Sequence, residues 1–177
     1  MHEFKLVNRS WISKIGTDHT KFIMSKVYSL KAVQVIHTNI DDAWNFFSNP
    51  ANLAAITPKA LGFKIISAHH GETMYAGQLI EYTITPLFGI PVYWMTEITH
   101  VLPKQYFIDE QRFGPYSLWH HQHHFKAIAG GVEMTDIVHY RLPFGPFGAL
   151  GLPLIKKQLS DLFAYRRQRV EQLFGKL

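Results

Sequence analysis

The pattern of apolar and polar positions divides the chain into a strand-rich part followed by one long helix. Between residues 61 and 142, six segments rich in β-branched and aromatic residues alternate with Gly, Pro or polar turns, which is typical of consecutive strands. Short connections between them favour an antiparallel meander. The segments read LGFKIIS, GQLIEYTIT, PVYWMTEITHV, QYFIDEQ, YSLWHHQHHFKA and VEMTDIVHYRL.

The residues before this meander predict one more strand and two short helices. VYSLKAVQVI is rich in β-branched residues and predicts the first strand. Asn39 or Asp41 can cap a short helix, DDAWNFFSN, that Pro50 ends, and ANLAAIT predicts a second one. Residues 1–26 show no sustained period, so we expect an N-terminal extension followed by one domain over residues 27–177.

The C-terminal pattern predicts an amphipathic helix of about 25 residues, because apolar residues recur there at three- and four-residue steps. A sheet with one apolar face is the partner that can bury this stripe, which favours an α+β fold with the helix packed on the sheet. The preceding segment PFGPFGALGLP is either a lid or portal, or a tight apolar connection. The stripe consists of Ile155, Leu159, Leu162, Phe163, Arg166, Val170, Leu173 and Phe174.

Composition narrows the class of protein. The chain has 177 residues, of which 47% are hydrophobic and 18% charged, enough for one domain with a full core. It contains no run of about 18 apolar residues and does not begin with the pattern of a secretory signal, so we expect a soluble, cytoplasmic protein. The absence of cysteine excludes disulfides, thiolate metal sites and cysteine nucleophiles.

The net charge of +5 does not by itself indicate a nucleic-acid partner, because the cations are dispersed except near the C-terminus. We interpret that basic cluster as a solvated helix face and expect no nucleic-acid partner. Contact with an anionic membrane surface stays an alternative. The cluster consists of Lys156, Lys157, Arg166, Arg167 and Arg169.

Period-two alternation places polar side chains on the aromatic inner face of the sheet. Burial without a partner would cost several kcal/mol, so these groups must bond to one another, to water or to a ligand. A satisfied structural pair, a pocket lining and a metal site are all possible for the two histidines. A lone HxH motif is a weak metal signal, and we predict neither a metal nor a cofactor. The polar inner residues are Asp109, Gln111, His121, His123 and Asp136.

The alternation also gives expectations for the outward-facing histidines, the inner aspartates and the inner aromatic residues. His120 and His124 alternate onto the opposite face, where we expect exposure to solvent. Burial would raise the pKa of Asp109 or Asp136 and suit acid–base work, whereas pairing with histidine would lower it. The large aromatic residues of the inner face are either core or pocket wall.

The order of elements, together with WNFFSNPANLAAITP, FIDEQRFGPYSLWHHQHHF, MTDIVHYRLPFG and LFAYRRQ, resembles the START-like superfamily, also called SRPBCC or Bet v 1-like helix-grip proteins. A bacterial ligand-binding or polyketide cyclase/dehydrase-like group is the most similar within it. The similarity runs from Val27 to Phe174. It implies a curved seven-stranded antiparallel sheet wrapped around the long helix, two short helices between strands 1 and 2, and a cavity. The motif positions imply pocket roles for Trp119, His121, His123, Asp136 and Tyr140.

We therefore expect a carrier or sensor of a small hydrophobic molecule, such as a lipid, fatty acid, polyketide or aromatic compound, acting as a monomer or homodimer. One alternative is a cyclase, aromatase or dehydratase in which His121 or His123 is the base, oriented by Asp109 or Asp136. Another is a peripheral lipid-transfer module that uses the basic helix and the apolar loop on a membrane. The predicted ligand-binding residues are Tyr82, Trp94, Phe107, Gln111, Trp119, His121, His123, Met134, Asp136, Tyr140, Phe144 and Phe163.

Overall fold

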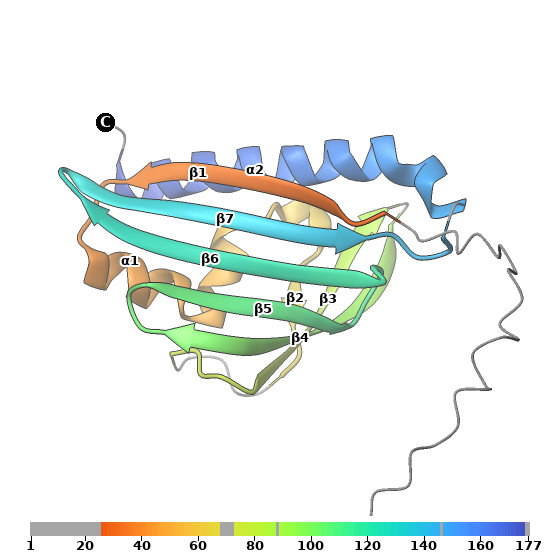
Figure 1. Cartoon of the computed structure of the whole chain (residues 1–177), viewed down its shortest axis with the longest axis horizontal. Helices are drawn as coiled ribbons and strands as arrows, with labels where there is room; N and C mark the ends of the chain where they lie inside the picture. The colour runs from red at the N-terminus through yellow and green to blue at the C-terminus, as the bar shows by residue number, and fades with distance from the viewer. Residues whose placement is uncertain (1–25, 68–72, 88, 146, 176–177) are drawn as a thin grey trace, which may run out of the picture.

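A seven-stranded antiparallel sheet in the order β1-β7-β6-β5-β4-β3-β2 forms the body of the protein (Figure 1). The computed structural model describes residues 26–67, 73–87, 89–145 and 147–175, so nearly all of the predicted extension lies outside the described residues. The strands are β1 (Tyr28–Ile36), β2 (Lys64–Ile65), β3 (Gln78–Leu87), β4 (Ile90–Leu102), β5 (Tyr106–Phe113), β6 (Leu118–Ile128) and β7 (Gly131–Arg141).

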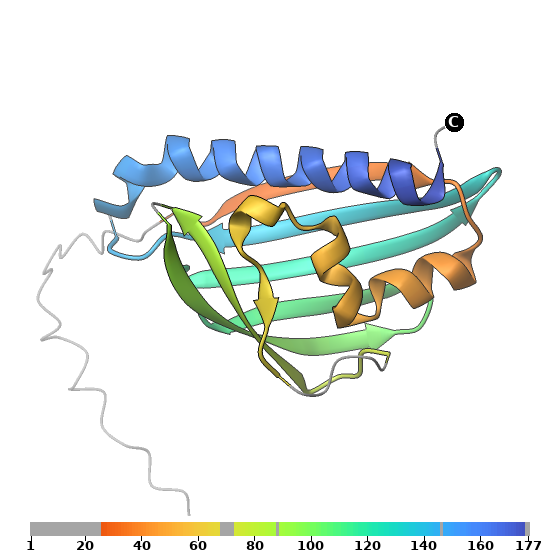
Figure 2. The ribbon, with the colours of Figure 1, turned by 180° about the vertical axis from the view of Figure 1, so that it is seen from behind.

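One long helix and several short ones cover the concave face of this sheet. Figure 2 shows α2 running the length of the sheet, with α1 and the short helices beside it. None of the described helices is long and apolar enough to cross a membrane. The helices are α1 (Ile40–Phe47), the 3₁₀ helices η2 (Pro50–Ile56), η3 (Lys59–Leu61) and η4 (Phe147–Gly151), and α2 (Leu152–Phe174).

The predicted strands and helices are confirmed, with one marked difference at the edge of the sheet. Asn39 caps α1 by accepting from the backbone N–H of Asp42, one of the two predicted caps. The segment LGFKIIS, predicted as a full strand, contributes only two residues to the sheet. Its first residue, Leu61, is instead the last residue of η3, and Gly62 caps that helix with a φ of 52°, a left-handed conformation that glycine adopts at little cost.

Strand pairing brings the inner polar residues together. In the β5–β6 register Asp109 lies opposite His121, and in the β6–β7 register His123 lies opposite Asp136. The β4–β5 pairing contains two register shifts, near Thr96 and between Ile98 and His100. Such shifts increase local twist and bend a sheet, which helps to make its inner face concave.

Two apolar clusters fasten α2 to the rest of the protein. In the first, Val170 packs with Trp44, Phe125 and other residues of α1 and the sheet. In the second, Leu159 packs with Tyr140 and its neighbours on β7. The two contact points on α2 are about 16 Å apart along the helix axis, so the intervening turns lie over the middle of the sheet.

Arginine side chains add hydrogen bonds to these contacts. Arg167 donates to the backbone carbonyl of Val33 at 2.8 Å, and Arg169 donates to that of Ala55 at 3.2 Å. Arg167 is exposed, as the predicted solvated face requires, and Arg169 is half-buried, but each of the two side chains also joins α2 to a neighbouring element. Lys156 and Lys157 are exposed, as expected.

Replacing the buried Trp44 tests the first cluster. The indole meets Phe107 and Phe125 edge to face at 6.2 and 5.7 Å. We expect Trp44→Ala to lower the free energy of unfolding by about 3–5 kcal/mol in urea denaturation, because it opens a cavity in the core. The matched change Phe113→Ala, at an aromatic residue that is mainly exposed, should cost no more than about 0.5 kcal/mol. Equal losses would contradict this account of the core.

Candidate functional site

A cavity of about 530 Å³ lies between the inner face of the sheet and the helices. Its volume falls within the range of about 300–1,000 Å³ that small-molecule sites occupy. Apolar side chains form most of its wall, including Phe47 of α1, Leu53 of η2, Ile80 of β3 and Leu162 of α2. The cavity therefore joins parts of the chain that are far apart in sequence.

Four titratable side chains on three adjacent strands form the polar floor of this cavity. His121 Nε2 lies 2.9 Å from Asp136 Oδ1, and His121 Nδ1 lies 3.5 Å from Asp109 Oδ2. His123 Nε2 lies 2.9 Å from Asp109 Oδ2, and His123 Nδ1 lies 2.9 Å from Asp136 Oδ1. The last approach is out of line for a hydrogen bond. Each imidazole thus lies between the same two carboxylates, an arrangement that we call the His–Asp network.

Contacts within the His–Asp network hold both carboxylates in the ionised form. Burial by itself would raise the pKa of Asp136, but the hydrogen bond from His121 and the close contact with His123 outweigh burial and lower that pKa far below its ordinary value. The pKa of Asp109 is lowered in the same way, against burial, by the His123 hydrogen bond and the charges nearby. Because Asp136 titrates lower in the folded chain, it stabilises the fold above pH 3.8, and this contribution is lost as the pH falls through its folded pKa.

The pKa values of the two histidines of the network shift in opposite directions. Burial and the neighbouring His123 lower the pKa of His121, against the attraction of the carboxylates. For His123, burial opposes protonation, but the hydrogen bond with Asp109 and the close contact with Asp136 outweigh it and raise the pKa. His123 is therefore the imidazole of the network that protonates more readily, and His121 is the one that more readily stays neutral.

Arg166 of α2 is a cavity residue that the sequence interpretation assigned to a solvated face. It lines the cavity, and its Nε is buried without a hydrogen-bond partner. Burial lowers its pKa, whereas the charges of Asp136 and Asp109 raise it and keep the guanidinium protonated. The helical period contained the signal, since Arg166 falls within the apolar stripe that packs on the sheet.

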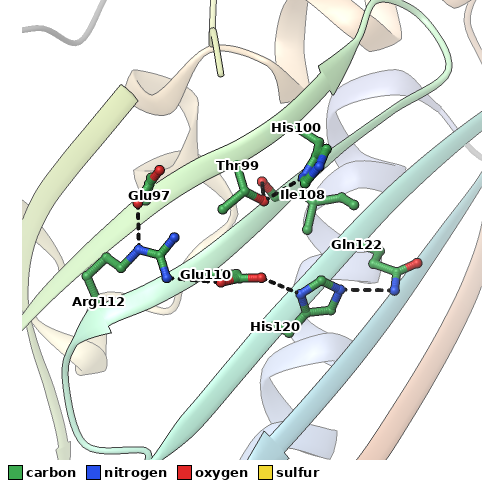
Figure 3. A network of polar contacts seen from close by, with 8 residues as sticks. All are labelled: Glu97, Thr99, His100, Ile108, Glu110, Arg112, His120 and Gln122. Carbon is green, nitrogen blue, oxygen red and sulfur yellow. Dashed lines mark hydrogen bonds and ion pairs between the residues drawn. The ribbon is translucent and has the colours of Figure 1, made fainter. Parts of the chain in front are cut away.

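The outer face of the same strands carries a second, separate polar network (Figure 3). Glu110 accepts from Arg112 at 3.1 Å and contacts His120 Nδ1 at 2.9 Å, and His120 Nε2 lies 3.1 Å from Gln122 Nε2. His120 and His124 point outward, as predicted, but both are half-buried and bonded to neighbours rather than freely exposed.

Most predicted pocket residues line the cavity, while three do not. Gln111 bonds to the backbone of Tyr116 at 2.6 Å and supports the β5–β6 turn. Tyr140 is 2% exposed and packs in the second apolar cluster, and Phe144 is 82% exposed on the surface. These three residues are therefore not among those that line the cavity in the structure. The predicted residues that line the cavity are Tyr82, Trp94, Phe107, Asp109, Trp119, His121, His123, Met134, Asp136 and Phe163.

The glycine-rich connection between β7 and α2 does not cover the cavity. None of its described residues from 143 to 153 is among the lining residues. Phe147 and Leu150 are 78% and 83% exposed. In this conformation the segment is an apolar surface feature rather than a lid.

The donor set of the polar floor also suits a metal ion. Three potential ligand atoms lie within 4.8 Å of one another, one each from Asp109, His121 and His123. Two imidazoles and a carboxylate are ligands that zinc and non-haem iron accept. In the structure Asp109 Oδ2 lies 2.9 Å from His123 Nε2 and 3.5 Å from His121 Nδ1.

The His–Asp network makes a prediction about titration. We expect Asp136→Asn to lower the pKa of His123, measured by NMR titration of the imidazole, because one of the two carboxylates that favour its protonated form is removed. The matched change Glu110→Gln, which alters the outer face beside His120, should leave the His123 titration unchanged. A His123 pKa that is insensitive to Asp136→Asn would mean that the network does not exist in solution.

Comparisons with known proteins establish the fold but no activity. Protein-family models give no match, and neither do curated proteins. Among solved structures, the chain is similar to CV1439 from Chromobacterium violaceum, with a TM-score of 0.64, 10% identity, and coverage of 84% of this chain and 98% of that one. TTHA0849 from Thermus thermophilus gives a TM-score of 0.62, 14% identity, and coverage of 82% and 99%.

Plant proteins share the same architecture. The ginseng major latex-like protein from Panax ginseng gives a TM-score of 0.58, 14% identity, and coverage of 85% of this chain and 99% of that one. Ara h 8.0201 gives a TM-score of 0.56, 13% identity, and coverage of 83% and 99%. Identities this low carry the fold alone. The chain therefore has the Bet v 1-like helix-grip fold that the sequence resemblance implied.

Proposed function

We propose that the protein binds a small, mainly apolar molecule in the cavity between the sheet and α2, as a carrier or sensor. The observation that carries this proposal is the cavity itself, which is large enough for a ligand and has a largely apolar wall. The fold is also one that typically binds ligands.

The energetics of the wall favour such a ligand. Moving apolar surface out of water is worth about 25 cal/mol per Å². Side chains such as Phe47, Ile80 and Trp94 supply apolar surface from three different elements. The polar floor beneath them can orient a bound molecule, as a few polar groups commonly do in apolar sites.

Filling the cavity tests this function. Ala32 of β1 lies opposite Asp136 in the sheet and lines the cavity. We expect Ala32→Phe to weaken binding of a neutral fluorescent naphthalene probe at least about tenfold, or about 1.4 kcal/mol, because the added ring occupies the space of the ligand. Fluorescence titration gives the dissociation constant.

The neighbouring change Lys31→Phe is the matched control. Lys31 alternates to the exposed face of the same strand, so the same ring added there leaves the cavity open. Probe binding should then stay close to that of the unmodified protein. Equal effects of the two substitutions, or no binding by the unmodified protein, would refute a ligand site in the cavity.

Acid–base catalysis is a second candidate function, favoured by the neutral imidazole of His121 at the cavity floor. A neutral imidazole accepts a proton, and the carboxylates on both sides of it stabilise the cation that results. These are the parts that a cyclase, aromatase or dehydratase needs.

An enzyme is distinguished from a carrier by measuring turnover and ligand binding separately in the same variants. If the protein is a dehydratase, it converts a model aryl β-hydroxyketone to the enone, which absorbance follows. His121→Asn should then abolish the reaction while the naphthalene probe still binds, because the amide cannot accept the proton. The outward His124→Asn is the control and should leave the rate unchanged. A reaction rate that survives His121→Asn would exclude this residue as the base.

A further inference from the structure

Besides the Nδ1 of His123 in the polar floor, two hydrogen-bond donors in the cavity wall lack an acceptor among the described residues. The indole Nε1 of Trp94 and the guanidinium Nε of Arg166 are both buried, and neither has a partner among the described residues. Trp94 comes from β4 and Arg166 from α2, so the two donors belong to the sheet and to its helical cover. Most buried donors in folded proteins are paired, so an unpaired one needs an explanation.

The ring of Trp94 cannot easily turn to find a partner. It is 6% exposed and is held by Tyr82, stacked at 5.8 Å, and by Tyr116 and Trp119, edge to face at 5.7 and 5.4 Å. An indole N–H donates and cannot accept, so it needs an oxygen or another acceptor. Leaving it buried and unpaired costs about 1–3 kcal/mol.

The guanidinium of Arg166 has no direct ion pair among the described residues. Asp109 and Asp136 act on it through space, but their close contacts are with His121 and His123. The guanidinium carbon lies 5.6 Å from the ring centroid of Phe163. The positive charge of Arg166 thus faces an aromatic ring and the cavity, and no carboxylate of the described residues touches it. Such a charge can bind the anionic group of a ligand.

The charges of the floor allow such an anion to approach. Each carboxylate contacts both imidazoles, and the charges of Asp109 and Asp136 also act on Arg166, so the negative charge of the floor is offset by the groups around it. The carboxylate oxygens already contact the imidazoles, whereas the donors of Arg166 remain available. A negative group on a ligand can therefore approach Arg166, which lines the cavity without a direct ion pair to a described residue.

We propose that the molecule bound in the cavity is an amphipathic carboxylic acid, whose carboxylate pairs with Arg166 and whose apolar body fills the remaining space. Trp94 donates its indole N–H to an oxygen of the same ligand. A pure hydrocarbon would leave both donors unpaired. This inference rests on the proposed ligand-binding function and specifies the class of ligand.

Two probes with the same chain and different head groups test the inference. Decanoate and decanol share the alkyl chain, and competition against the neutral naphthalene probe gives both dissociation constants. We expect decanoate to bind at least about tenfold more tightly than decanol, because a charge-assisted bond to Arg166 is stronger than a neutral one. Equal affinity for the two probes would overturn the inference.

Three variants identify the donors. Arg166→Gln should weaken decanoate binding at least about tenfold while decanol and the naphthalene probe change less than about threefold. Trp94→Phe keeps an aromatic ring, removes the N–H and should weaken decanoate binding several-fold. Lys156→Gln removes a cation from the exposed side of the same helix and should change nothing. A loss of decanoate binding equal to the loss of decanol binding in Arg166→Gln would refute the ion pair.

The outcomes separate this inference from the proposed function. If no probe binds the unmodified protein, the ligand-binding function itself fails. If the naphthalene probe and decanol bind but decanoate has no advantage, the cavity binds ligands and only the carboxylate is refuted. Circular dichroism checks that each variant is folded, and should Arg166→Gln not fold, the two head groups in the unmodified protein and in Trp94→Phe decide the matter.

Discussion

The pairing of two carboxylates with two imidazoles on the inner face of β5, β6 and β7 is the constraint on which the middle of this protein depends. Unpaired, any of these groups would cost several kcal/mol inside an aromatic interior. The contacts among Asp109, His121, His123 and Asp136 remove most of that cost because each imidazole lies between both acids. They require one register on each side of β6, since a shift by one residue would turn every member to the opposite face.

This network also explains how a polar floor and an apolar wall coexist in one cavity. The two clusters that fasten α2 to the fold lie on either side of the floor, so the helix spans the space between them rather than filling it. Arg166 and Phe163 project from the spanning turns and line the cavity. The sheet thus supplies a fixed set of charged groups, and the helix supplies both the roof and Arg166, a cation that faces these groups without a direct ion pair to a described residue.

The sequence predicted most of the architecture because two simple periods dominate it. Alternation on the strands identified Asp109, His121, His123 and Asp136 as inward-facing, and the helical period identified α2. Arg166 was missed as a cavity group, although its place in the apolar stripe pointed there, because a cation near other cations was taken to be solvated. The period also could not show that Gln111 supports a turn or that Phe144 lies outside. Such details depend on turn geometry, which alternation does not encode.

One wall of the cavity is held by backbone hydrogen bonds and the other by side-chain contacts, and this difference affects how fast a bound ligand, or guest, can leave. Backbone hydrogen bonds join every strand to its neighbours, from β1 at one edge of the sheet to β2 at the other. Opening the sheet would therefore break a cooperative ladder of these bonds. Side-chain packing and a few bonds such as those of Arg167 and Arg169 hold the helical side, which can loosen locally at a smaller free-energy cost. Exchange with solvent should then proceed by transient loosening of α2 and its short neighbours, and the residence time of a guest would report how firmly these arginines fasten the helix.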